Sequence, residues 1–184
     1  MLEKLISRTE ALIAAFRENN VIDLKHLAND CIEDAAMQND ELFAQLSLIA
    51  YSLNKLSSKD HIVRNAKWGS AKNAILGLLE KCIAFLKAKK IREFKAELQG
   101  VSDKVRGIDE TLGHYVENVF DKARVKQAST AYAFGLSLSS AAGLTGADKK
   151  ELLNYIGTTK IHDEQEEGAG IESRLKVLRQ IFQH

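Results

Sequence analysis

The chain contains no proline among its 184 residues, and only two cysteines. Proline breaks helices and commonly marks loops, so its absence fits long helices joined by turns of glycine, serine, asparagine and aspartate. The net charge of only +1 excludes a protein that attracts nucleic acid through a strongly basic overall composition. Any contact with a polyanion must therefore come from a local cluster of cations.

The cysteines, Cys31 and Cys82, each lie within an apolar helical pattern. Neither has a histidine or a second cysteine at the spacing of metal ligands. The N-terminus lacks the charged and apolar regions of a signal peptide. We therefore expect two reduced thiols in the core of a cytoplasmic protein, rather than a disulfide.

One uncharged stretch, Ala128–Ala147, is long enough to cross a bilayer. It contains seven hydroxyl side chains and three glycines. Burying those hydroxyls in lipid is costly, and glycine weakens an isolated helix. We expect this stretch to lie inside a water-soluble domain, with no membrane as a partner.

Three helices are expected in the first 56 residues, because apolar residues recur at steps of three and four. The third, Leu42–Leu56, is apolar on most sides, which is typical of a central buried helix. The helix lengths and short turns match tetratricopeptide-like repeats of about 34 residues, but the tryptophan, glycine, tyrosine and proline of that signature are missing. A short repeat array and a plain antiparallel bundle both remain open.

Asp60 is a suitable cap for a further helix, and a strong apolar stripe runs from Ala74 to Leu86. The stripe resumes at Phe94, beyond the cationic run Lys87–Lys95, and reaches Ile108. This pattern is compatible with one long bent helix or with two helices that meet near Lys89 and Lys90.

From Asp109 onward, the residue pattern predicts a basic helix, a short Ala-rich helix, a glycine-bounded turn and another helix, in that order. We expect helices over 109–136, 138–143 and 147–156, the last ending at Gly157. Thr145 and Asp148 fit a capping box at the start of the last helix. This order favours a helix-turn-helix-like module.

In a helix-turn-helix the outward side chains of the second helix meet bases and phosphates. A helical projection places Leu152, Leu153, Tyr155 and Ile156 on the packed side of helix 147–156, with Lys150 and Asn154 opposite. Lysine and arginine contact phosphate or guanine, and asparagine pairs with adenine. We expect the candidate nucleic-acid contacts to form one solvent-facing ridge; they are Lys122, Arg124, Lys126, Lys150, Asn154 and Lys160.

No catalytic constellation is recognisable, since the histidines are dispersed and Ser139 and Ser140 lack a strand-turn-helix elbow. Gly143–Gly146 matches the GxxG loop of KH domains but has no neighbouring strands. His162 and the acidic residues after it are consecutive in sequence, and such residues rarely converge on one metal ion. We therefore predict that the protein is not an enzyme and has no catalytic residues, no metal site and no cofactor.

The sequence predicts an all-α protein, either a multi-helix bundle or a short helical-repeat array, with a helix-turn-helix-like C-terminal module. We expect residues 1–108 to form the bundle or tetratricopeptide-like region and residues 109–163 the module. Residues 164–184 are expected to form an acidic linker and an amphipathic helix that docks on the module or binds a partner.

Two segments, Leu46–Ile62 and Ala123–Glu164, resemble a family of uncharacterised archaeal helical proteins. The resemblance includes a YxGxTKIHD signature, here Tyr155, Gly157 and Thr159–Asp163. It implies a tetratricopeptide-like front, a helix-turn-helix-like rear and an archaeal, cytoplasmic origin. It implies no activity. The spacing from Thr145 to Leu152 is longer than in an ordinary helix-turn-helix, which argues against insertion into a DNA groove.

Two hypotheses follow. The first is a non-enzymatic nucleic-acid-binding or regulatory protein that contacts DNA or RNA through the rear module and a protein through the front. The second is a helical protein-interaction scaffold or homodimerising adaptor that binds no nucleic acid. It is favoured by the apolar surface of Leu42–Leu56 and of the last helix.

Overall fold

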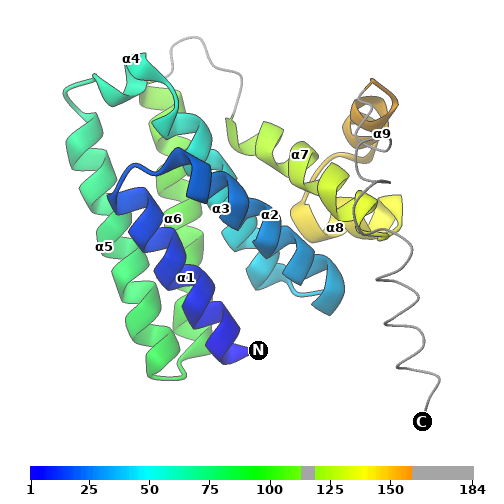
Figure 1. Cartoon of the computed structure of the whole chain (residues 1–184), viewed down its shortest axis with the longest axis horizontal. Coiled ribbons are helices and arrows are strands. Elements are labelled where there is room, and N and C mark those ends of the chain that lie inside the picture. Colours follow the sequence, from blue (N-terminus) through cyan, green and yellow to red (C-terminus); the bar gives the residue numbers. More distant parts are fainter. Residues whose placement is uncertain (113–118, 159–184) are drawn as a thin grey trace.

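The computed structural model describes residues 1–112 and 119–158, which form nine helices and contain no strand. The all-α prediction is therefore confirmed. The helices are α1 (Leu2–Arg17), α2 (Val21–Gln38), α3 (Glu41–Ser57), α4 (Asp60–Val63), α5 (Trp68–Lys87), α6 (Ile91–Leu112), α7 (Val119–Ala133), α8 (Leu138–Thr145) and α9 (Lys149–Thr158). In Figure 1, α1–α6 form one side of the molecule, and α7–α9 lie along its other side.

The polar residues between the apolar stripes end one helix and begin the next. Asn20 caps α2 by accepting a hydrogen bond from the Asp23 amide, and Asp40 caps α3 by accepting one from the Leu42 amide. Asn39, between α2 and α3, has a φ of 51°, a left-handed conformation that asparagine tolerates better than most residues. These local preferences produce the short turns that fold α1, α2 and α3 against one another.

Helix α3 is the central element of the fold, as its apolar sequence predicted. It packs against α1, α2, α4, α6, α7 and α8. Leu46, Ile49 and Leu53 are at most 1% exposed. Burying each such side chain contributes about 1.5–3 kcal/mol to stability. Because α3 contacts helices from both ends of the chain, the packing is that of a bundle rather than of an array in which each repeat touches only its neighbours.

The region after α3 differs in detail from the prediction. Asp60 does not cap a long helix but begins the four-residue α4, and α5 starts later, at Trp68. The Trp68 ring packs edge-on against Phe16, with 6.2 Å between centroids, and this contact joins α5 to α1. Of the two alternatives for the basic run, the second is confirmed: α5 and α6 are separate helices, with Lys89 between them at a φ of 57°.

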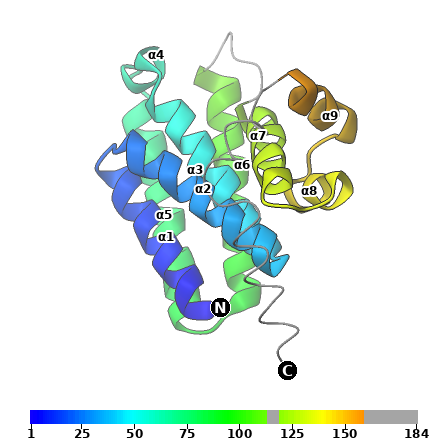
Figure 2. The same ribbon diagram turned by 45° about the vertical axis from the view of Figure 1, so that its right-hand side comes forward.

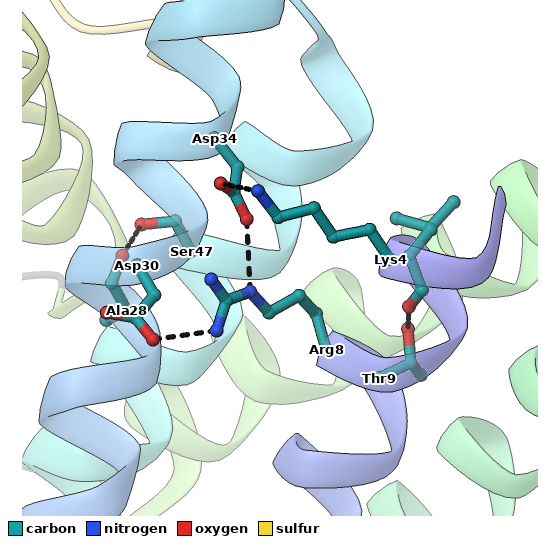
Figure 3. Close-up of polar contacts among 8 residues, drawn as sticks. Lys4, Arg8, Thr9, Ala28, Asp30, Asp34 and Ser47 are labelled. Atoms are coloured by element: carbon teal, nitrogen blue, oxygen red, sulfur yellow. Dashed lines mark hydrogen bonds and ion pairs between the residues drawn. The ribbon is translucent and has the colours of Figure 1, made fainter. Parts of the chain in front are cut away.

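A charge network centred on one buried carboxylate joins α1 to α2 (Figure 3). Asp34 on α2 is 4% exposed and pairs with Lys4 and with Arg8, whose Nε lies 3.0 Å from its carboxylate. Arg8 also reaches Asp30 at 2.7 Å. Burial alone lowers the pKa of Arg8, but its hydrogen bond to Asp34 and the two nearby carboxylates outweigh burial and raise that pKa. The guanidinium therefore stays charged and holds the two helices together.

The rear helices share the core of the front helices. Phe120, Ala123 and Ala131 of α7 and Leu152 of α9 belong to the same buried cluster as the apolar residues of α1–α6. Helix α7 packs against α2, α3 and α6. Helix α6 continues through position 108 to Leu112, so the expected division between residues 108 and 109 falls inside a helix.

Candidate functional site

Helices α7, α8 and α9 position the candidate contact residues. Helix α7 ends near Gly135, which has a φ of 101°, and Ser137 then caps α8 by accepting a hydrogen bond from the Ser140 amide at 3.0 Å. Gly146 ends α8 with a φ of 71°, a conformation that favours glycine. The chain turns there into α9, so a short turn joins two helices that both pack on α7 (Figure 2).

The predicted capping box at this turn is wrong. Thr145 belongs to α8, and its hydroxyl donates to the Ala141 carbonyl at 3.0 Å instead of capping α9. Asp148 provides the cap, since its carboxylate accepts hydrogen bonds from the amides of Lys150 and Glu151 at 2.8 and 3.0 Å. Helix α8 was expected to end at Gly143 but continues to Thr145, and Gly146 forms its left-handed C-terminal cap.

The faces of α9 agree with the helical projection except at one residue. Leu152 is fully buried, Tyr155 and Ile156 are half-buried, and Lys150 and Asn154 are exposed. Leu153 was expected on the packed side but is 59% exposed. Helix α9 also continues through Gly157 to Thr158. Because Leu153 is exposed, the packed side of α9 is narrower than the projection predicted.

A cleft of about 710 Å³ opens between α3, α7 and α9. We call it the tyrosine cleft, because Tyr51 of α3 and Tyr155 of α9 both line it. Its remaining lining residues come from α7 and α9; they are Asp121, Lys122, Val125, Lys126, Glu151, Asn154 and Thr158. Its volume lies within the range of about 300–1,000 Å³ that is typical of ligand pockets.

Three of the six predicted contact residues meet in this cleft. Lys122 and Lys126 are one turn apart on α7, and Asn154 reaches the same cleft from α9. Lys150 is exposed in the first turn of α9 but is not among the lining residues. Lys160 lies outside the described residues. The structure thus brings together side chains that are some 30 positions apart in sequence.

Arg124 is not among the residues that line the cleft. Its Nη1 lies 3.1 Å from Asp121, and its guanidinium stacks over the Phe120 ring at 5.5 Å from the centroid. Its Nε is buried and has no hydrogen-bond partner among the described residues. The same guanidinium lies next to the α8–α9 turn, 3.6 Å from where a Cβ on Gly146 would stand. Arg124 therefore packs against Phe120 and the α8–α9 turn, and its side chain is about one third exposed.

The two tyrosines are the part of the site that sequence reasoning missed. The Lys55 ammonium lies 5.2 Å from the centroid of the Tyr51 ring, and the Lys126 ammonium lies 6.0 Å from that of Tyr155. Burial raises the pKa of both phenols, and Tyr155 adds to the shift at Tyr51. Both phenols therefore stay protonated at neutral pH. Tyr51 belongs to a helix that is apolar on most sides and Tyr155 to the packed side of its helix, so the sequence does not indicate that they share a cleft.

The cleft is concave and mixed in charge, unlike the solvent-facing cationic ridge that was expected. Lys122 and Lys126 line it together with Asp121 and Glu151, so cations and carboxylates are equal in number. The carboxylates reduce the attraction for a polyanion. Long-range electrostatic attraction is correspondingly weaker than the five outward cations of the expected ridge would have provided.

Disulfides, metal ligands and membrane-spanning helices are the other features that would indicate a function in the rest of the described chain. Cys31 and Cys82 are buried and form no disulfide with each other, as predicted. No group of three or more histidine, cysteine or acidic side chains within residues 1–112 and 119–158 is arranged to hold a metal ion. None of the helices in that part of the chain has the length and apolar character needed to cross a membrane. His162 lies outside the described residues.

Comparison of the chain with protein-family models, curated proteins and solved structures finds no significant match. The geometry of the tyrosine cleft is therefore the basis for assigning a function.

Proposed function

We propose that this is a non-enzymatic nucleic-acid-binding protein and that the tyrosine cleft is its contact site. The observation that carries the proposal is the convergence of Lys122, Lys126 and Asn154 on one solvent-open cleft that also contains two tyrosines. These residues come from α3, α7 and α9. Their meeting depends on the tertiary fold and not on proximity in sequence.

The lysine, asparagine and tyrosine side chains of the lining each have a role in nucleic-acid recognition. Lysine ammonium groups bind phosphate and fix the position of the strand, whereas base edges are read by hydrogen bonds. Asn154 has both a donor and an acceptor for such an edge. Tyrosine rings stack on bases, and their protonated hydroxyls donate hydrogen bonds. The combination is more specific for a nucleotide than lysine residues alone.

Fluorescence anisotropy with labelled DNA and RNA oligonucleotides tests the proposal. Binding is expected at about 50 mM salt and is expected to weaken as the salt is raised to about 200 mM, because bound cations release counterions from the strand. The double variant Lys122→Ala/Lys126→Ala is expected to weaken binding at least tenfold and to reduce the salt slope by about two, one for each phosphate contact.

The matched control is Lys25→Ala/Lys104→Ala, which removes the same charge from exposed positions on α2 and α6. It is expected to bind nearly as the wild type does. If the two double variants bind equally, the cleft is not the contact site. Absence of binding even at low salt would remove the proposal altogether.

A helical protein-interaction scaffold is the second candidate. The equal numbers of lysines and carboxylates in the cleft favour it, because a polypeptide segment carries charges of both signs whereas a nucleic acid does not. Light scattering and a pull-down test this candidate. A strictly monomeric protein that retrieves no partner would count against it.

The archaeal origin and the cytoplasmic location implied by the sequence resemblance remain proposals. Of the signature residues, Tyr155 lines the cleft and Gly157 lies in the last turn of α9. Thr159–Asp163 lies outside the described residues. The resemblance brings no activity and leaves the nucleic-acid proposal unchanged.

A further inference from the structure

We propose that the tyrosine cleft receives an unpaired nucleotide, so that the protein binds single-stranded nucleic acid in preference to duplex. This inference rests on the proposed function and names the class of nucleic acid that the same site takes. It is carried by the shape of the site, its volume and its two aromatic rings.

The shape of the site does not fit the reading of a duplex. A helix-turn-helix reads DNA by inserting a projecting helix into a major groove about 12 Å wide. Asn154, the side chain on α9 best suited to read a base, instead lines a concave cleft beside Lys122 and Lys126 of α7. A base edge in the interior of a duplex cannot enter such a hollow unless the nucleotide leaves the stack.

The volume of the cleft also fits a single nucleotide. At about 710 Å³ the open cleft has room for one nucleotide, whereas a double helix could only lie across its mouth. Asp121 lines the cleft from α7, beside the lysines and paired with Arg124, and Glu151 lines it from α9. Each carboxylate repels phosphate, so the site accommodates the few phosphates that flank one nucleotide better than the two charged backbones of a duplex.

The aromatic rings supply the contact that only an unpaired base can make. In a duplex both faces of a base are covered by its neighbours, whereas an unpaired base exposes a face that can stack on a tyrosine. Lys126 lies over the Tyr155 ring at 6.0 Å, the outer limit of a cation–π contact, whereas Lys55 lies closer to the Tyr51 ring, at 5.2 Å. Because its lysine is held less closely, Tyr155 is the ring that we expect a base to reach. The flexible lysine can give up the ring to a base and turn its ammonium towards the adjoining phosphate.

The test compares one labelled oligonucleotide of about 12 nucleotides, first as a single strand and then annealed to its complement, by anisotropy at low salt. We expect the single strand to bind at least tenfold more tightly, since stacking of one base is worth a factor of this order. Equal affinity, or tighter binding of the duplex, overturns this inference and leaves the proposed function in place. If neither form binds, the proposed function itself has failed.

Substitution of Tyr155 separates stacking from general charge attraction. Tyr155→Leu removes the ring and is expected to weaken single-strand binding about tenfold while leaving the weaker duplex binding unchanged. Tyr155→Phe keeps the ring and is expected to bind within about twofold of wild type. Tyr132→Leu is the matched control, because Tyr132 is also a half-buried tyrosine but does not line the cleft.

Circular dichroism and thermal unfolding show whether each variant is folded. If Tyr155→Leu does not fold, Tyr155→Phe and the comparison of single strand with duplex still test the inference. Single-strand binding by a folded Tyr155→Leu at the wild-type level would overturn the inference. Loss of binding in Tyr155→Phe to the same degree would also overturn it, because the hydroxyl rather than the ring would then be the contact.

Discussion

The two thiols show how strongly single residues are constrained by the packed interior. Cys31 and Cys82 are at most 1% exposed, and burial raises the pKa of each to about 12 from an ordinary value of 9.0. A buried thiol with this pKa remains protonated and unreactive at neutral pH. The sequence was sufficient to predict this state, because both cysteines stand at apolar positions of helical stripes.

These shifts predict that the protein loses stability at alkaline pH. In the unfolded chain the thiols release protons from about pH 9, whereas in the folded chain they retain them until about pH 12. The unfolded state therefore binds fewer protons in this window, and the free energy of unfolding falls as the pH rises from about 9 to 12. Urea unfolding at pH 8 and at pH 10.5 measures this loss.

The double variant Cys31→Ala/Cys82→Ala is the control for the alkaline prediction. It is less stable than the wild type at every pH because it removes buried atoms, but its loss between the two pH values is expected to be smaller. Tyr51 and Tyr155, whose pKa values are also raised, are present in both proteins. Identical losses in the two proteins would show that the thiols do not contribute.

Among the site residues, the sequence indicates which side chains can reach solvent, and tertiary packing decides which of them lie together. Lys122, Lys126 and Asn154 were selected for their chemistry and do meet in one cleft. Arg124 was selected on the same grounds, but it lies against Phe120 and the Gly146 turn. Periodicity assigns a residue to a face of a helix and does not reveal which other helix lies opposite that face.

The turn between α8 and α9 sets the direction of α9, one of the three helices that line the cleft, and it can be tested with a pair of glycine substitutions. Gly146 has a φ of 71°, so Gly146→Ala forces alanine into a left-handed conformation and is expected to destabilise the protein by about 1–2 kcal/mol. Gly143 lies inside α8 with open space around its Cβ position. Gly143→Ala is expected to stabilise by about 0.5–1 kcal/mol.

Chemical unfolding of both variants measures these changes. The opposite signs are the decisive result, because each variant adds the same methyl group. If Gly146→Ala proved neutral, the chain would be able to make this turn without a left-handed residue.

Helix boundaries could be predicted only where a local signal is strong. The turns at Asn20, Asn39 and Asp40 are marked by capping residues, and the sequence placed the first three helices correctly. The sequence does not decide whether α5 and α6 are one helix or two, because Lys87–Lys95 contains neither proline nor glycine. The start of α9 was misplaced because Thr145 and Asp148 both have capping side chains, and only the tertiary turn selects Asp148.

For the whole molecule, the sequence predicted the all-α class and the central position of α3 but did not determine how the rear helices pack. The apolar stripe of α7 is interrupted in the sequence by Lys126 and Gln127. In the structure Gln127 is fully buried, and α7 packs against α2, α3 and α6. One continuous core therefore includes residues from α1 to α9.

A continuous core predicts that front and rear unfold together. Trp68 reports on α5, and a Trp68→Phe/Phe134→Trp variant moves the fluorescent probe to the end of α7. For each of the two proteins, the urea midpoint measured by tryptophan fluorescence is expected to equal the midpoint measured by circular dichroism. A fluorescence midpoint that departs from the circular dichroism midpoint in either protein would instead indicate two folding units.

The position of Asp34 matters for how the protein is prepared. High salt weakens contacts between exposed charges, and at about 1 M the screening length is only about 3 Å. The carboxylate of Asp34 is buried and touches its cationic partners directly, so it is largely protected from this screening. A wash at that ionic strength is expected to release host nucleic acid bound to the lysines of the cleft. The contact between α1 and α2 is expected to persist, so the washed protein is suitable for affinity measurements.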